Sequence, residues 1–352
     1  MGDNAVRYTY RRYVSLAGGS DLGPSGDGDK QGRRSPVEDL GMHHAGPTVQ
    51  STFPDALTQY AHYCSYFVPY NANAFEHPLQ GMVKANRSHL DDALTRALNK
   101  RESQSTIRKL TTPSPNSVDF SSNDFLSLAT SRELRQLYID ELHKAPTTTR
   151  LGSGGSRLLD GNSTYAEQLE TDIATFHRAE TGLLCNSGFD ANAGLFSCLP
   201  QPGDAIVYDE FIHASVHDGM RLSRAGPRVA FSHNSAHALE EVLDKLISDD
   251  VLMKAGKRNV FIAVEAVYSM DGDVAPLAEM VKIVHRLLPL GNGHVIVDEA
   301  HSNGVLGPSG RGLVCGLGLE NKVSVRLHTF GKALACNGGT SAISQRTNAI
   351  KP

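Results

Sequence analysis

Short apolar stretches rich in β-branched residues alternate along the chain with stretches whose apolar residues recur every three or four positions. The first kind predicts strands at 181–185, 205–208, 228–231, 259–264 and 294–297. The second kind predicts helices, among them 165–176 and 277–288. Such alternation is typical of a mostly parallel sheet covered by helices on both faces, so we expect an α/β fold.

Further elements are predicted at the two ends of this pattern. Leu90, Leu94 and Leu98 recur at helical spacing and predict an amphipathic helix within 88–110. The pair Thr164 and Glu167 predicts a capping box at the start of the 165–176 helix. The stretch 340–344 is a candidate for the last strand of the sheet.

The polar residues most able to carry chemistry follow the predicted strands. In open parallel sheets ligands bind beyond the carboxyl ends of the strands. Five separate strand ends bring candidates to that edge: Ser187 with Gly188, His213, Ser269, Asp298 and Lys332. We therefore expect a small-molecule site there.

Three of these positions together match the needs of pyridoxal phosphate. Lys332 follows an apolar strand and a tight turn, and partial burial would lower its pKa enough to make it a nucleophile. Asp298 could pair with a cationic pyridine nitrogen. Gly188 stands where a strand enters a helix, so its backbone N–H could bind a phosphate at the positive helix end.

Each position also has a structural interpretation. Gly188 could belong to an ordinary strand-to-helix turn, Asp298 could be a helix cap, and Lys332 could be a surface lysine. The string 298–301, Asp-Glu-Ala-His, resembles a helicase box, but the chain has no G-x-x-x-x-G-K-[ST] phosphate loop. Histidine pairs at 213/217 and 233/237 have zinc-binding spacing without a third local ligand, so no metal site is predicted.

Composition narrows the class of partner. The chain has 352 residues, a net charge of -4 and scattered basic residues, which does not favour nucleic acid binding. The five cysteines lack any C-x-x-C pair, which argues against a disulfide framework. No apolar run is long enough to span a membrane, and no secretory signal is recognisable. We expect a cytoplasmic protein, with mitochondrial or peroxisomal targeting as alternatives.

The domain organisation follows from where these patterns begin and end. Residues 18–47 are rich in Gly, Ser, Asp and Pro, which predicts disorder. We expect a disordered or poorly ordered extension at 1–80, with ordered structure starting near Met82. After this extension we expect an N-terminal helix and linker at 81–120, a cofactor-binding domain at 121–345 and an unrelated tail at 346–352.

Seven motifs resemble those of the α-oxoamine synthases, pyridoxal-phosphate enzymes with the three-layer α/β/α fold of aspartate aminotransferase (fold type I). The resemblance covers roughly 90–339. The motifs lie at 120–126 (FSSNDFL), 152–157 (GSGGSR), 187–192 (SGFDAN), 213–215 (HAS), 265–273 (EAVYSMDGD), 298–301 (DEAH) and 329–332 (TFGK).

The resemblance implies roles for individual residues. Lys332 would bind the cofactor aldehyde and abstract the amino acid's α-proton, Asp298 would hold the pyridine nitrogen, His213 would stack on the ring and His301 would contact the ring oxygen. The remaining implied contacts are Ser187, Gly188, Phe189, Ser269 and Thr329 to the cofactor and Arg108 to the acyl substrate.

The resemblance also implies a reaction and an assembly. Members condense an amino acid with an acyl-CoA, losing carbon dioxide, and act as homodimers. The best match within the family joins L-alanine to pimeloyl-CoA in biotin synthesis; another amino acid and thioester pair is an alternative. The family continues past the lysine into a small C-terminal domain that this sequence lacks, so a catalytically inactive truncated homologue is a further alternative.

Overall fold

The computed structural model describes residues 88–114 and 116–344, in two compact units, 88–118 and 119–344. The expectations for 1–80, Met82 and the tail at 346–352 lie outside these residues. In the first unit, α3 (His89–Ser103) begins at Ser88, which forms a capping box with Asp91. The predicted amphipathic helix is therefore present, but Leu90 and Leu94 are 66% and 53% exposed.

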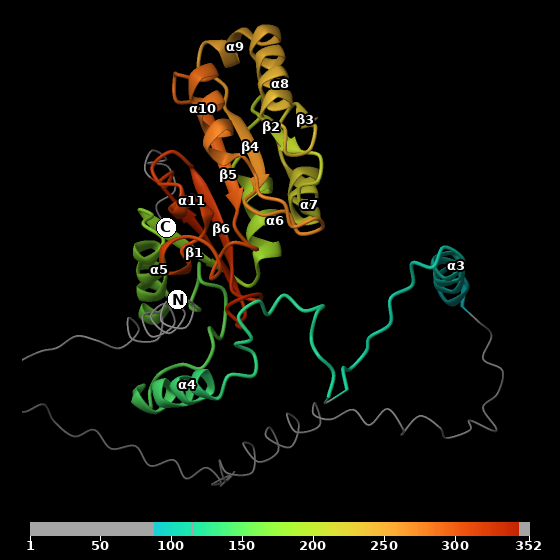
Figure 1. Cartoon of the computed structure of the whole chain (residues 1–352), viewed down its shortest axis with the longest axis vertical. Helices are drawn as coiled ribbons and strands as arrows, with labels where there is room; N and C mark the ends of the chain where they lie inside the picture. The colour runs from blue at the N-terminus through green and yellow to red at the C-terminus, as the bar shows by residue number, and fades with distance from the viewer. Residues whose placement is uncertain (1–87, 115, 345–352) are drawn as a thin grey trace, which may run out of the picture. The chain divides into compact units, whose positions relative to one another are not determined.

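The second unit is built on one seven-stranded sheet, whose order is β1-β7-β6-β5-β4-β2-β3 (Figure 1). The strands are β1 (Thr181–Cys185), β2 (Ala205–Asp209), β3 (Arg228–Phe231), β4 (Val260–Glu265), β5 (Gly293–Asp298), β6 (Val325–Thr329) and β7 (Gly339–Ile343). Only β7 runs antiparallel, between β1 and β6; the other neighbours are parallel. The α/β fold with a mostly parallel sheet is confirmed.

The central strands β2, β4 and β5 are mostly apolar because both of their faces are buried. Along β4, Val260, Ile262 and Val264 face one cluster while Phe261 and Ala263 face another. This alternation is the two-residue period of a strand. Helices α8 (Ala236–Asp249) and α10 (Leu277–Leu287) supply the first cluster, and α6 (Gly188–Cys198) and α7 (Ala214–Leu222) supply the second.

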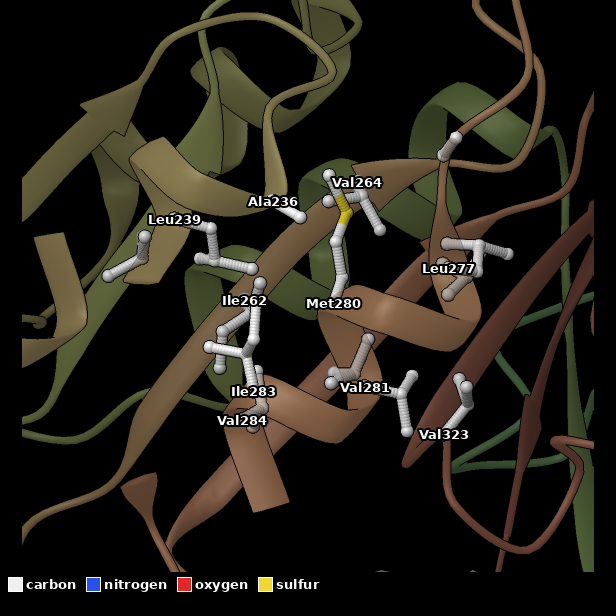
Figure 2. Close-up of a cluster of buried hydrophobic side chains, with 14 of the residues drawn as sticks. Ala236, Leu239, Ile262, Val264, Leu277, Met280, Val281, Ile283, Val284 and Val323 are labelled. Carbon is white, nitrogen blue, oxygen red and sulfur yellow. The ribbon is translucent and has the colours of Figure 1, made fainter. Parts of the chain in front are cut away.

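Figure 2 shows how the first cluster is assembled. Leu239 of α8 and Met280 of α10 meet Ile262 of β4, and all three side chains are buried. Figure 1 shows α8 and α10 side by side on this face of the sheet. The packing fixes the strands whose carboxyl ends carry the polar residues.

The remaining helices are α4 (Arg132–Lys144), α5 (Thr164–Phe176), α9 (Val251–Lys254), the short 3₁₀ helix η2 (Pro308–Gly310) and α11 (Leu313–Gly316). The predicted cap of α5 is wrong. Ser163 is the N-cap, its hydroxyl accepting from the Ala166 N–H, while Thr164 is already helical. Ser163 therefore satisfies one free N–H of the first turn, a role that the prediction assigned to Thr164.

Candidate functional site

Helix α6 begins directly after β1 and approaches the end of β6. Ser187 is its N-cap, and the Ser187 hydroxyl accepts from the Asp190 N–H at 3.0 Å. Gly188 is packed so closely that a Cβ there would lie 3.0 Å from Thr329 Cβ and 3.2 Å from Thr329 Oγ1. The structure thus brings together three predicted phosphate contacts, beside a helix N-terminus that favours anions.

Lys332 lies beyond β6 and is half-buried. Its Nζ is 2.7 Å from His301 Nε2. Burial lowers the pKa of Lys332, although the charges of Asp298 and Glu265 oppose that effect. Burial, with Lys332 and His213, lowers the pKa of His301 to about 4, so the imidazole is neutral near pH 7. A neutral imidazole can exchange a hydrogen bond with the lysine amine.

Asp298 ends β5 and is linked to His213 through two buried side chains. The Asn192 amide donates to Asp298 Oδ2 at 2.7 Å and to Ser215 Oγ at 3.0 Å. Ser215 Oγ lies 2.7 Å from His213 Nδ1, which also accepts from the Ser215 N–H at 3.2 Å. Because Nδ1 accepts, the ring proton of a neutral His213 belongs on Nε2. These contacts orient both Asp298 and His213.

Glu265, the last residue of β4, stands opposite Asp298 in the sheet register and is buried. Burial and the nearby Asp298 charge raise the pKa of Glu265 to about 8, although Lys332 acts against this. Near pH 7 Glu265 therefore holds a proton, which avoids placing two negative charges side by side at this sheet edge.

Three further residues predicted for the site are Phe189, Ser269 and Arg108. Phe189, at the start of α6, meets the His213 ring edge-on with centroids 6.0 Å apart. Ser269 lies exposed in the turn after β4. Arg108 belongs to the first unit and is exposed, and its contact with an acyl substrate stays a prediction.

The sequence interpretation missed Asn192, Ser215 and Glu265 as site residues. All three stand inside motifs at strand ends, which was an available signal. Their importance comes from burial: a buried amide, hydroxyl or carboxyl needs a partner, and the partners come from elements far apart in sequence.

The donor set fits pyridoxal phosphate. The cofactor needs an uncharged amine, a carboxylate for its ring nitrogen and donors for its phosphate. Lys332 with its lowered pKa, Asp298 held by Asn192, and the α6 N-terminus closed by Thr329 against Gly188 supply these three.

Residues 88–114 and 116–344 show neither a metal-binding cluster nor a membrane-spanning helix. Within that part of the chain no group of three or more His, Cys, Asp or Glu side chains could hold a metal ion. None of the helices described there is both long and apolar enough to cross a bilayer.

Comparison with known proteins shows the family of this chain and the cofactor of that family. The family model "Aminotransferase class I and II" matches residues 115–350. A solved lysine-to-alanine variant of serine palmitoyltransferase from S. paucimobilis, with a bound PLP–myriocin aldimine, is 26% identical, with a TM-score of 0.59, over 74% of this chain and 67% of that one.

Two curated relatives are more similar in sequence. An 8-amino-7-oxononanoate synthase from Emericella nidulans is 60% identical over 71% of this chain and 60% of its own length. An aminoacyl transferase sphA from Byssochlamys spectabilis is 44% identical over 76% of this chain and 54% of its own length. The chain thus spans about three-fifths or less of these relatives. It belongs to the class I and II aminotransferases, a pyridoxal-phosphate-dependent family, and is similar there to α-oxoamine synthases.

Proposed function

We propose that this chain supplies the cofactor-binding part of an enzyme that condenses an amino acid with an acyl thioester and releases carbon dioxide. The observation that carries the proposal is the meeting of Lys332, His301 and Asp298 beside the α6 N-terminus. Bound pyridoxal phosphate supplies an electron sink that stabilises negative charge on the amino acid's α-carbon.

The chain's own residues would bind, orient and move protons. Burial lowers the pKa of Lys332, which favours the uncharged amine whose Nζ lone pair would take the α-proton. Neutral His301, 2.7 Å from Nζ, holds that amine in place. Asp298, held by the Asn192 amide, would face the ring nitrogen and favour its protonated form, while the neighbouring Glu265 holds a proton and adds no competing charge.

The remaining predicted contacts complete the proposed site. His213, fixed by Ser215, would stack on the ring, and Ser187, Gly188, Phe189, Ser269 and Thr329 would contact the cofactor. Arg108 would contact the acyl substrate. We propose that the site works in a homodimer of soluble protein in the cytoplasm.

The substrate pair we propose is L-alanine with pimeloyl-CoA, giving 8-amino-7-oxononanoate. The relative from Emericella nidulans that carries that name is 60% identical over 249 residues. A second candidate is another amino acid and acyl thioester pair, which the similarity to aminoacyl transferases named sphA favours.

Covalent capture tests cofactor binding first. Purified chain with added pyridoxal phosphate should show an absorbance band of lysine-bound cofactor, and borohydride reduction should fix the cofactor to Lys332 in peptide maps. The matched control is Lys322→Ala, which removes an exposed lysine in the turn before β6 and should leave the band intact, whereas Lys332→Ala should abolish it. A band absent from folded wild-type protein would contradict the proposal.

Coenzyme A release then identifies the substrates. L-alanine with pimeloyl-CoA is compared with a panel of amino acids and acyl thioesters. Release with another pair alone would replace the first candidate by the second, and bound cofactor without any release would favour an inactive homologue.

A further inference from the structure

His233 lies outside the lysine site, where the loops that follow β2, β3 and β4 come together. Its Nδ1 is 2.8 Å from Asp209 Oδ1, and its Nε2 is 3.0 Å from Asp273 Oδ2. The ring stacks on Phe211 with centroids 4.4 Å apart and meets Tyr268 edge-on at 4.5 Å. We call Asp209, His233 and Asp273 the His233 cluster.

The geometry of the cluster requires a charged ring. A neutral imidazole has one N–H, so its other nitrogen would turn a lone pair toward a carboxylate. Burial lowers the pKa of His233, but hydrogen bonds and charges from Asp209 and then Asp273 outweigh burial and raise it. Glu210 places a third carboxyl group nearby, since its Oε1 accepts from the backbone N–H of His233 at 2.8 Å.

The groups packed around His233 do not offset this charge. The Tyr268 phenol is uncharged, since burial and then Asp209 raise its pKa. Asn234 contributes neutral donors: its backbone N–H donates to Asp209 at 2.7 Å and its side chain to Asp273 at 2.5 Å. His233 is therefore the cation among three carboxyl groups, Asp209, Glu210 and Asp273.

The cluster joins two loops that carry proposed cofactor contacts. Asp209 ends β2, and His213 follows four residues later as the N-cap of α7. Asp273 lies in the loop after β4 that contains Ser269, and that loop is closed by the hydrogen bond from the Tyr268 N–H to the Asp273 carbonyl at 3.0 Å. His233 itself comes from a third loop, after β3.

We propose that His233 is a positioning residue for the cofactor site: its imidazolium joins the β2 loop to the β4 loop and so fixes His213 relative to Ser269. This inference rests on the proposed function. Below the ordinary pKa of histidine the ring is charged and the stabilisation is complete. It is lost as pH rises through the raised pKa of His233, because a neutral ring leaves one carboxylate without a donor.

Hydrogen exchange of the cofactor-free protein tests the cluster directly. Exchange is followed in peptides covering 209–213 and 268–274 across a pH series from about 6 to 9, corrected for intrinsic rates. Wild-type protection should fall as pH rises. Asp273→Asn should move the fall to lower pH, because it removes one of the carboxylates that keep the ring charged. A purely structural role would lower protection in Asp273→Asn without moving its pH dependence.

Two histidine variants distinguish the effect of the His233 cluster from the effect of losing any histidine. His233→Gln should lose the pH dependence of protection. The matched control His237→Gln changes an exposed histidine on α8 that faces only Glu241, at 3.4 Å, and should behave as wild type. If His233→Gln does not fold, the comparison of wild type with Asp273→Asn still tests the proposal. Identical pH midpoints for the loss of exchange protection in these two proteins would overturn it.

Cofactor affinity tests the positioning role. Fluorescence titration with pyridoxal phosphate should show His233→Gln binding about tenfold more weakly than wild type near pH 6, with a smaller difference near pH 9. Equal affinity at both pH values would overturn the positioning role. If the wild-type protein binds no pyridoxal phosphate, the proposed function is contradicted. The hydrogen exchange experiment would then still test whether the His233 cluster joins the β2 and β4 loops.

Discussion

Replacement of Glu265 by glutamine should make stability less dependent on pH. Glu265 is 2% exposed at the end of β4, opposite Asp298. Burial and then the Asp298 charge raise its pKa from 4.5 to about 8. The folded protein therefore holds this proton more tightly than the unfolded chain does.

The sign and size follow from linkage. The stabilising contribution of a group with a raised pKa is complete below its unfolded value of 4.5 and is lost as pH rises through about 8. A shift of this size corresponds to about 4–5 kcal/mol, and most of it is lost between about pH 5 and pH 9. Glutamine resembles the protonated carboxyl but cannot ionise. Relative to wild type, Glu265→Gln should gain about 4 kcal/mol of stability over that interval.

Urea unfolding of the cofactor-free protein, followed by far-ultraviolet circular dichroism, measures this difference. The chain has no tryptophan, so intrinsic fluorescence would report poorly. The matched control is Glu279→Gln, which removes an exposed carboxylate on α10 and shows what the loss of one surface charge does at each pH. An equal difference between Glu265→Gln and wild type at both pH values would refute the assignment of the proton to Glu265.

Three further changes test the packing and charge of the site. Gly188→Ala places a Cβ 3.0 Å from Thr329 Cβ and should weaken pyridoxal phosphate binding about tenfold in a fluorescence titration. The control Gly194→Ala, whose new Cβ has no atom within 4 Å, should not weaken binding. Equal losses of affinity in the two variants would contradict the close packing at Gly188. Asp298→Asn removes a charge that raises the pKa of Lys332. Acylation of Lys332, followed by mass spectrometry, should therefore reach half its maximal rate at a lower pH than in wild type. An unchanged pH dependence of acylation would argue against electrostatic coupling between Asp298 and Lys332. Leu239→Ala empties a fully buried position and should cost about 3 kcal/mol in urea unfolding; a loss below about 1 kcal/mol would show that the core collapses to fill the space.

The sequence predicted most of the sheet. Strands β1 and β3 begin and end where the apolar pattern placed them, and β4 and β5 differ by one residue. For β4 and β5 the pattern succeeds because helices cover both faces of these central strands, so most of their positions are apolar. The pattern did not name α4, α7, α8 or α9, nor the turn-like η2 and α11, although α7 and α8 both contribute buried side chains to the core.

The candidate site was predictable only in part. Strand ends and motifs identified Lys332, His301 and Asp298, and the structure brings Lys332 to within 2.7 Å of His301. The partners of Asp298 could not be predicted, because Asn192 lies 106 positions away and meets it only after α6 packs against the sheet. Hydrogen bonds between distant segments leave no periodic signal in sequence.

Arg326 illustrates the division between sequence and tertiary structure. The sequence by itself determined that its segment is a strand leading to Lys332, because local alternation and β-branched content depend only on neighbours. Tertiary structure alone decided that this arginine is fully buried, with Nη1 donating to the His177 carbonyl at 2.5 Å. It likewise decided that β7 enters between β1 and β6 and that Glu265 shares its surroundings with Asp298. Burial and charge pairing depend on contacts between distant residues, which only the folded chain creates.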